Sequence, residues 1–197
     1  MPVKGEDGHR RSQAERRAST RGALVAAARQ LFAEKGFAAT GREEIVALAG
    51  VTRGAMYHHF ASKEALFQAV WEELEQELNE AIVVAAMATP DPVEQLRLGS
   101  LAFLDAAASP AVSRVVLLDA PSVLAPDVRR ALSERYGLGL VRDALQALMD
   151  AGAIDPQPVD PLAHVVLAAL HEAATLVADG ADRVEVGRVV ERFLARL

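Results

Sequence analysis

Apolar residues recur at intervals of three and four along most of the chain, the spacing that places them on one face of an α-helix. The first stripe predicts a helix from residue 19 or 20 to Lys35 and consists of Leu24, Ala27, Ala28, Leu31 and Phe32. Gly36 can adopt the left-handed conformation that ends a helix, because it has no side chain. Phe37 can then fold back on Phe32, so we expect a turn at this point.

Two short helices and one long helix are predicted next. In the sequence TGRE, the Thr40 hydroxyl and the Glu43 carboxylate form a capping box for the free amides at a helix start. Gly50 is expected to end this helix, Thr52 to cap a third helix and Ser62 to cap a fourth. The fourth helix is expected to join the two parts of the molecule, and its apolar stripe consists of Leu66, Ala69, Val70, Leu74, Leu78 and Ile82.

The remaining chain predicts five further helices. Asp91, Ser109 and Asp160 each precede a proline and are expected to cap helix starts, whereas Gly152 and Gly180 are expected to end helices. The predicted helices cover about residues 92–108, 110–119, 127–149, 161–178 and 183–196.

The segment YGLGL (136–140) interrupts the helix predicted at 127–149. Each glycine costs about 1 kcal/mol inside a helix, so a kink or a break is expected there. No segment shows the strict alternation of a strand, and a composition rich in Ala, Leu, Glu and Arg favours helices. The predicted fold class is therefore all-α, with about nine helices.

Composition narrows the class of protein. The chain contains no cysteine, which excludes disulfides, zinc ribbons and thiol catalysis and agrees with a reducing, cytoplasmic environment. No apolar stretch follows the charged N-terminus, so no signal peptide is expected. The apolar run 162–178 is nearly long enough to span a membrane, but His164, His171 and Glu172 interrupt it. We expect this run to be a buried helix and expect no membrane association.

Charge is unevenly divided along the chain. Residues 1–63 contain eleven Lys or Arg and six Asp or Glu, a net charge of +5, whereas the other 134 residues contain ten and twenty-one, a net charge of −11. This pattern indicates a basic head on an acidic body. Residues 1–18 are polar and aperiodic and are expected to form a flexible basic arm. The alternative is a basic tail without a partner.

The segment around Gly50 is typical of a helix-turn-helix, in which the second helix lies in the DNA major groove. We expect the small core of this motif to consist of Ile45, Ala49, Val51 and Met56. If Met56 points inward, Arg53, Gly54, Tyr57 and His58 face outward. Arg53 can then bind a guanine edge or a phosphate, and Tyr57 can contact a phosphate or a thymine methyl.

Three further side chains lie at predicted helix starts, where free amides and the positive end of the helix dipole favour a phosphate. They are Thr40, Thr52 and Lys63.

The stretch GFAATGREEIVALAGVTRGAMYHHFASKEALFQAV resembles the DNA-binding domain of the TetR family of bacterial transcriptional regulators. The resemblance covers about residues 20–70 and depends on AGV, the Y-x-H-F element and the following S-K-E-x-L. It departs from the family pattern at Arg42, which can add a phosphate contact, and at Val46. The resemblance implies that the DNA-facing residues are Thr40, Thr52, Arg53, Gly54, Ala55, Tyr57, His58, His59 and Lys63.

The resemblance also implies an obligate homodimer, a palindromic double-stranded DNA operator and a helical body that binds a small-molecule inducer. The implied domains are an arm (1–18), a three-helix helix-turn-helix DNA-binding domain (19–64) and a ligand-binding and dimerisation domain (65–197). The dimer is expected to form through the last two helices, and the alternative is a monomeric bundle with a thick core.

Other chemistry finds little support in the sequence. HEAAT (171–175) lacks the second histidine of a zinc-protease helix, and no Glu-x-x-His pair is present for a di-iron site. No glycine-flanked nucleophile and no phosphate-binding loop occurs. We therefore expect no enzyme activity, no metal and no cofactor.

The inducer site is the part that the sequence defines least. The candidates combine apolar side chains with a few polar ones, as ligand pockets do, although each of them can instead be ordinary core. They are Phe67, Trp71, Phe103, Leu117, Asp119, Met149 and His171. The function predicted is a ligand-released repressor, and the alternative is a helical module that binds a small molecule or a protein without operator activity.

Overall fold

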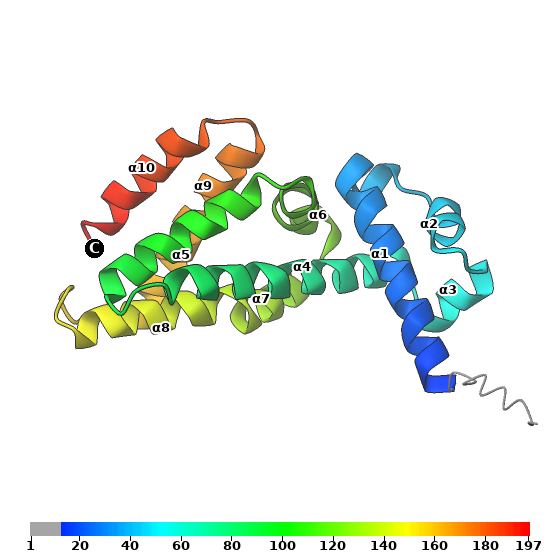
Figure 1. The fold of residues 1–197 in the computed structure, drawn as a ribbon, viewed down its shortest axis with the longest axis horizontal. Coiled ribbons are helices and arrows are strands. Elements are labelled where there is room, and N and C mark those ends of the chain that lie inside the picture. Colours follow the sequence, from blue (N-terminus) through cyan, green and yellow to red (C-terminus); the bar gives the residue numbers. More distant parts are fainter. Residues whose placement is uncertain (1–12) are drawn as a thin grey trace, which may run out of the picture.

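The computed structural model describes residues 13–197, which form ten α-helices and one π-helix and contain no strand. Figure 1 shows an elongated molecule in which a small head, α1 to α3, lies at one end and a larger helical body at the other. Helix α4 (Lys63–Ala86) runs from the head along the body and joins them. The all-α fold and the connecting role of the fourth helix are as predicted.

The head consists of α1 (Gln13–Ala39), α2 (Arg42–Ala49) and α3 (Arg53–His59). Helix α1 begins earlier than predicted, so residues 13–18 of the expected arm are helical. Residues 1–12, the rest of that arm, lie outside the described residues.

Gly36 interrupts α1 with φ 80° and ψ 168°, a conformation that is essentially restricted to glycine. The predicted turn is therefore present, although one more helical turn follows it before α1 ends. The ring of Phe37 lies 5.7 Å from the ring of Phe32, which confirms that the chain folds back here.

The capping box predicted from Thr40 and Glu43 is wrong by one residue. Gly41 precedes α2, and its amide donates a hydrogen bond to the Glu44 carboxylate at 2.8 Å. Thr40 is buried, and its hydroxyl donates to the carbonyls of Leu31 and Gly36. The hydroxyl is therefore bound to α1 and does not cap α2.

The caps predicted at the next two helices are confirmed. The Thr52 hydroxyl accepts a hydrogen bond from the Ala55 amide at 3.2 Å, and the Ser62 hydroxyl accepts one from the Ala65 amide at 3.1 Å. Gly50 has a left-handed conformation at φ 65° and ends α2 as predicted.

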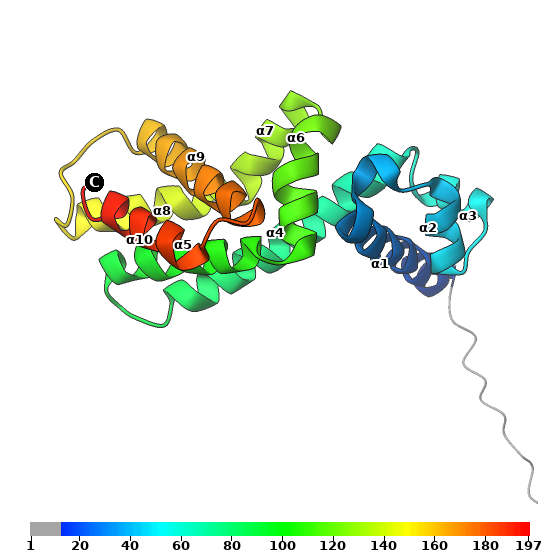
Figure 2. The same cartoon turned by 90° about the horizontal axis from the view of Figure 1, so that it is seen from above.

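The body is formed by the remaining helices together with α4. Helix α4 packs mainly on α5, α8 packs on α9, and α10 covers α5 and α9 (Figure 2). The elements are α5 (Pro92–Ala107), η1 (Val112–Asp119), α6 (Ala120–Val123), α7 (Pro126–Arg135), α8 (Gly137–Asp150), α9 (Val159–Ala178) and α10 (Arg183–Leu194).

Most helix boundaries in the body follow the sequence pattern. The predicted break at YGLGL is found at Tyr136, between α7 and α8. The Asp91 carboxylate caps α5, and the Ser109 hydroxyl accepts a hydrogen bond from the Val112 amide. The cap predicted at Asp160 is wrong, because α9 begins at Val159, two residues earlier than predicted, and Asp160 instead pairs with Arg142 at 2.5 Å.

The segment predicted as a helix at 110–119 is largely the π-helix η1. The Ala120 amide at its end donates to the Val115 carbonyl, a bond that spans five residues. Together with α4, η1 is the part of the body that packs on α1. π-Helices are rare and often lie at functional sites, and this one lies where the body meets the head.

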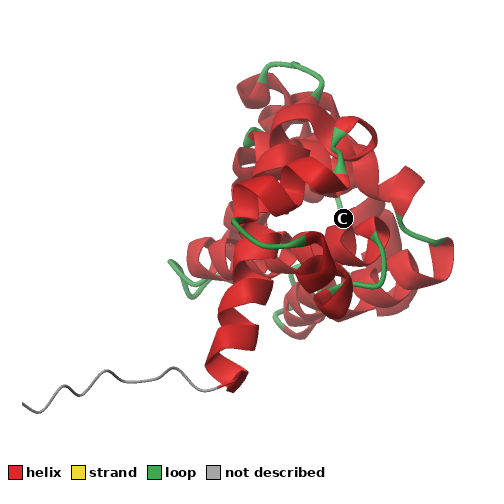
Figure 3. Ribbon diagram, turned by 90° about the vertical axis from the view of Figure 1, so that its right-hand side faces the viewer, coloured by secondary structure: helices red, strands yellow, loops and turns green. Residues whose placement is uncertain are grey.

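A single apolar core extends from the head into the body through α4. The predicted stripe of α4 is buried from Leu66 to Leu78, and Ile82 is half-buried. Seen from the end of the molecule at which the head lies, the described residues consist of helices and the loops that join them (Figure 3).

Helix α9 is long and apolar enough to cross a membrane by length and composition, a test that core helices of other proteins also pass. Seven of its residues are buried against the body, including Val166, Leu170 and Ala174. Val165 and Leu176 remain exposed on one face of the helix, with the exposed Glu172 between them.

Candidate functional site

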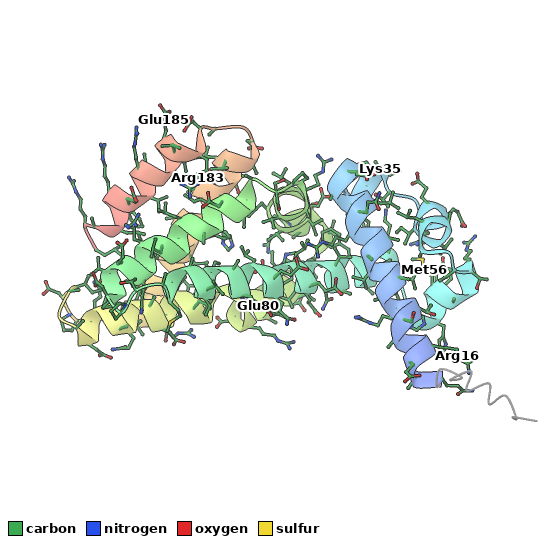
Figure 4. The ribbon with its side chains drawn as sticks, in the orientation of Figure 1. Arg16, Lys35, Met56, Glu80, Arg183 and Glu185 are labelled. Carbon is green, nitrogen blue, oxygen red and sulfur yellow. The ribbon has the colours of Figure 1, made fainter. Side chains whose placement is uncertain are left out.

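Helix α3 presents its polar side chains to solvent because one methionine anchors its other side. The Met56 side chain is fully buried and lies where α3 faces α1 (Figure 4). Ile45 of α2 is also fully buried, and the left-handed Gly50 sets the turn between the two helices. The residues exposed on this surface are Arg42, Thr52, Arg53, Gly54, Tyr57 and His58, while Ala55 and His59 are half-buried.

Arg53 lies at the centre of this exposed face. Its guanidinium is 3.0 Å from the Glu43 carboxylate of α2 and 5.8 Å from the centre of the Tyr57 ring. The hydrogen bond to Tyr57 and the charge of Glu43 raise the pKa of Arg53. Exposed ion pairs of this kind are weak, so a stronger acceptor can replace Glu43.

Basic side chains of α1 extend the positive surface beside α3. Arg16, Arg17 and Thr20 line a hollow together with His58 and His59. Burial, followed by the charges of His58, Arg17 and Arg21, lowers the pKa of His59. The sequence indicated only a flexible basic arm here, and the helical structure of residues 13–18 is what brings Arg16 and Arg17 to α3.

Two side chains expected to contact phosphates instead hold the head together. Thr40 is 1% exposed, and both bonds of its hydroxyl are to buried carbonyls, so the expectation that it faces outward is wrong. The Lys63 ammonium donates to the carbonyls of Phe37 at 2.8 Å and Thr40 at 2.9 Å and lies 4.0 Å above the Phe37 ring. Lys63, the first residue of α4, therefore binds the segment that joins α1 to α2.

The same junction is also held from the body. The Asp119 carboxylate of η1 accepts a hydrogen bond from the Phe37 amide at 2.7 Å and lies 3.9 Å from the Arg114 guanidinium. Arg114 covers Gly36 so closely that a side-chain carbon there would lie 2.6 Å from it. We name this contact between Arg114, Asp119 and the Gly36–Phe37 segment the η1 clasp.

Two cavities open in the body. The first has a volume of about 280 Å³ and lies between α4, α5, α8 and α9, and the second has a volume of about 790 Å³ and lies between α4, η1, α7 and α9. Glu75 and His171 line both cavities. Burial lowers the pKa of His171, whose ring lies 5.5 Å from that of Phe103.

Four of the seven predicted inducer residues line at least one of these cavities. Phe103 and His171 line the first cavity, and Trp71, Leu117 and His171 line the second. Phe67, Asp119 and Met149 line neither of the two, so these cavities give no support to their placement in a ligand site. Phe67 is fully buried between Phe32 and Phe37, and the Asp119 carboxylate is occupied by the η1 clasp.

Two family models match the chain in these two parts. The model of bacterial regulatory proteins of the tetR family matches residues 24–70, which contain α2, α3 and the start of α4. The model described as a tetracyclin repressor-like C-terminal domain matches residues 93–197, more than half of the chain. The chain belongs to the TetR family. The resemblance found in residues 20–70 is thus confirmed and extends to the body.

Solved structures and characterised proteins agree with this family. A TetR-family transcriptional regulator from Pectobacterium atrosepticum is 31% identical, with 93% of this chain and 94% of that chain covered and a TM-score of 0.75. The transcriptional regulator CymR of Pseudomonas putida is 35% identical over 127 residues, 62% of this chain and 63% of CymR. FadR of Bacillus subtilis, solved in complex with stearoyl-CoA, is 20% identical over 88% of this chain and 96% of that chain, with a TM-score of 0.75, and shows likeness of fold alone.

The matches to characterised proteins are partial. This TetR-family chain spans 63%, 45% and 37% of the length of three curated relatives that it matches. The two departures from the family pattern take different places in the structure. Arg42 is exposed at the first residue of α2, whereas Val46 is buried in the core of the head.

Glu75 is a cavity residue that the sequence analysis missed. Its neighbours Glu73 and Glu77 on α4 are exposed, but Glu75 is only 6% exposed. It lies four residues after Trp71 and three before Leu78, so it falls on the buried stripe of the helix. That spacing is the signal that could have found it.

We expect the replacement Glu75→Gln to stabilise this TetR-family protein above neutral pH. Burial raises the pKa of the Glu75 carboxyl to about 7, against 4.5 for an ordinary carboxyl. Because the folded pKa is the higher one, stability falls as pH rises from about 4.5 to about 7 and stays low above that window. Removing the charge should therefore raise the free energy of unfolding by about 2–3 kcal/mol at about pH 8 and by less than about 1 kcal/mol at about pH 4.5.

Urea unfolding of both proteins at the two pH values and at one fixed protein concentration measures this effect. Glu73→Gln is the matched control, because Glu73 is exposed on the same helix. Its effect should stay within about 0.5 kcal/mol at both pH values. An equal gain at both pH values for Glu75→Gln would contradict the explanation by a buried charge.

Proposed function

We propose that this chain is a transcriptional regulator that binds a palindromic operator as a homodimer and is released from DNA by a small molecule. The observation that carries the proposal is the outward face of α3, where Arg53, Tyr57 and His58 are exposed beside the arginines of α1. A duplex offers base edges and phosphates to such a set of donors. The family match supports the same assignment.

In this proposal α3 is the recognition helix in the major groove. Gly54 and Ala55 leave little side-chain bulk between the helix backbone and the bases. Arg42 at the start of α2 and the arginines of α1 provide phosphate contacts on either side. Two-fold symmetry would separate the two recognition helices by about one turn of DNA, roughly 34–36 Å, or somewhat more.

A pair of helices on the body offers a surface for the second subunit. Several large apolar side chains are exposed on α9 and α10. Such residues are usually buried, and a cluster of them on a protein surface is typical of an interface. They are Val165, Leu176, Val184, Val189 and Phe193, exposed by 60, 47, 56, 65 and 37%. A second copy of the chain would cover them, in agreement with dimerisation through the last two helices.

The η1 clasp supports a route from an effector to the DNA-binding head. Leu117 and Ala120 line the second cavity, and Asp119 between them holds the Phe37 amide. A molecule that binds one arrangement of η1 more tightly than another would shift the equilibrium between the corresponding positions of the head. The size of the shift is set by the difference between the two binding free energies. The proposal includes no catalytic step, and it places the protein with the DNA in the bacterial cytoplasm.

Replacing Arg53 with Ala tests base recognition. We expect the affinity for the selected operator to fall by about 1–3 kcal/mol and the preference at one base position to relax. Arg135→Ala is the matched control, because Arg135 is exposed on α7 in the body. Gel shifts on the operator and on its single-base variants measure both effects. A loss that is equal on all sequences would contradict base recognition by Arg53.

Selection of bound fragments from random DNA separates the proposal from its alternative, a helical module that binds small molecules or proteins. Enrichment of a palindrome supports the regulator. Failure to retain any duplex at low salt, where phosphate contacts are strongest, would decide for the alternative.

A further inference from the structure

We infer that the first body cavity, between α4, α5, α8 and α9, is a site for a small hydrophobic amine whose protonated nitrogen pairs with Glu75. The inference rests on the proposed function in one respect, since it names the chemical class of the effector. Binding to the cavity can be measured without DNA, so the two proposals can fail separately.

The cavity selects for an apolar body. It has a volume of about 280 Å³, near the lower end of the range for small-molecule sites. Its walls are apolar side chains from all four helices, among them Leu78, Ile82, Phe103, Val141 and Leu170. The polar lining residues besides Glu75 and Asp143 are Asn79, Gln95, Ser100 and His171, so the cavity offers few partners to a ligand with many polar groups.

Glu75 is the polar group that most needs a partner in this cavity. Its side chain is 6% exposed, and within residues 13–197 it makes no hydrogen bond and no ion pair. An ionised carboxylate in such surroundings is strongly disfavoured unless a cation accompanies it. A bound ammonium would provide that cation together with up to three hydrogen-bond donors.

The charges around the cavity exclude the opposite kind of ligand. Glu75 and Asp143 are its charged lining residues, and no Lys or Arg lines it. His171 also lines it, but burial lowers the pKa of this histidine, so its ring is neutral at physiological pH. A carboxylate ligand would therefore meet negative charge and no counter-charge.

Ser100 provides a second polar anchor. Its side chain is 4% exposed, and its hydroxyl oxygen has no hydrogen-bond partner among the described residues. Ser100 lies on α5 and Glu75 on α4, so the two unpartnered groups reach the cavity from neighbouring helices. Native proteins rarely leave such buried groups unsatisfied, which indicates that a ligand completes them.

A matched set of ligands tests the inference by isothermal titration calorimetry on the full-length protein at about pH 8, where Glu75 is largely ionised. The probes are n-octylamine, n-octanol and n-octanoate, which share one apolar chain and differ in the charge of the end group. We expect octylamine to bind about 10–100-fold more tightly than octanol, the range of a charge-assisted hydrogen bond. Octanoate should bind more weakly than octanol.

Three variants assign this preference to residues. Glu75→Gln should remove the preference for the amine over the alcohol while it still binds octanol. Ser100→Ala should weaken octylamine binding by about 3–10-fold, the size of one hydrogen bond. Glu73→Gln, on the exposed face of the same helix, should leave all three affinities unchanged.

Three outcomes would overturn the inference. They are an absence of octylamine binding, tighter binding of octanoate than of octylamine, and an amine preference that persists in Glu75→Gln. A gel shift is then carried out separately. If octylamine binds the protein but leaves the operator complex intact, the amine site stands and the proposed release mechanism fails.

Discussion

The double replacement Val165→Asp and Val189→Asp is expected to separate the dimer into monomers. Operator affinity should then fall by about 10²–10⁴-fold, because two linked half-site contacts become independent ones. Val165 lies on α9 and is 60% exposed, and Val189 lies on α10 and is 65% exposed. Both side chains point away from the core of the single chain, so their replacement should leave the fold of each subunit intact.

Sedimentation velocity measures the subunit number, and gel shifts on the selected operator measure the affinity. Val84→Asp is the control, because Val84 is 74% exposed on α4 and lies outside the proposed interface. Circular dichroism should show unchanged helix content in both variants. An intact dimer in the double variant would refute dimerisation through α9 and α10, and full operator affinity of a monomer would refute the need for two subunits.

Replacing Phe67 with Ala is expected to lower the free energy of unfolding by about 3–5 kcal/mol, the usual cost of removing a buried phenylalanine. The Phe67 ring is fully buried, 5.4 Å from the ring of Phe32 and 5.3 Å from that of Phe37. Since these rings join α1 to α4, the cavity left behind would lie where the head is attached to the body.

Urea unfolding at a fixed protein concentration measures this change. Tyr57→Ala is the control, because the Tyr57 side chain is 42% exposed and its removal should cost little stability. Phe67→Ala should also retain its affinity for octylamine, because Phe67 lines neither body cavity. A loss of less than about 1 kcal/mol would mean that the aromatic cluster does not stabilise the junction.

The contrast between Phe67 and Glu75 shows why candidate ligand residues are hard to select from sequence. Both lie on the buried stripe of α4. Phe67 packs against rings of α1, whereas Glu75 opens onto two cavities. A helical periodicity tells which side of a helix is inward, but it does not tell whether another side chain fills the space there.

Asp119 and Lys63 show the same limit for charged groups. Each was assigned to a ligand or a phosphate on the basis of residue type and position. In the structure their charged groups bind backbone atoms of the segment after Gly36, which are 82 and 26 residues away in the chain for the bonds to Phe37. The place of that segment beside α4 and η1 is set by the packing of helices that are distant in the chain.

The sequence by itself determined the all-helical fold, the turn at Gly50, the caps at Thr52 and Ser62, the inward side of α3 and the TetR-family resemblance. The helical periodicity, the turn and the caps depend on interactions within about four residues, and the chain carries these wherever it folds. The tertiary structure alone decided the π-helix, the η1 clasp, the burial of Thr40 and the cavities around Glu75. In those cases the outcome depends on which distant groups are left without a partner when the helices pack.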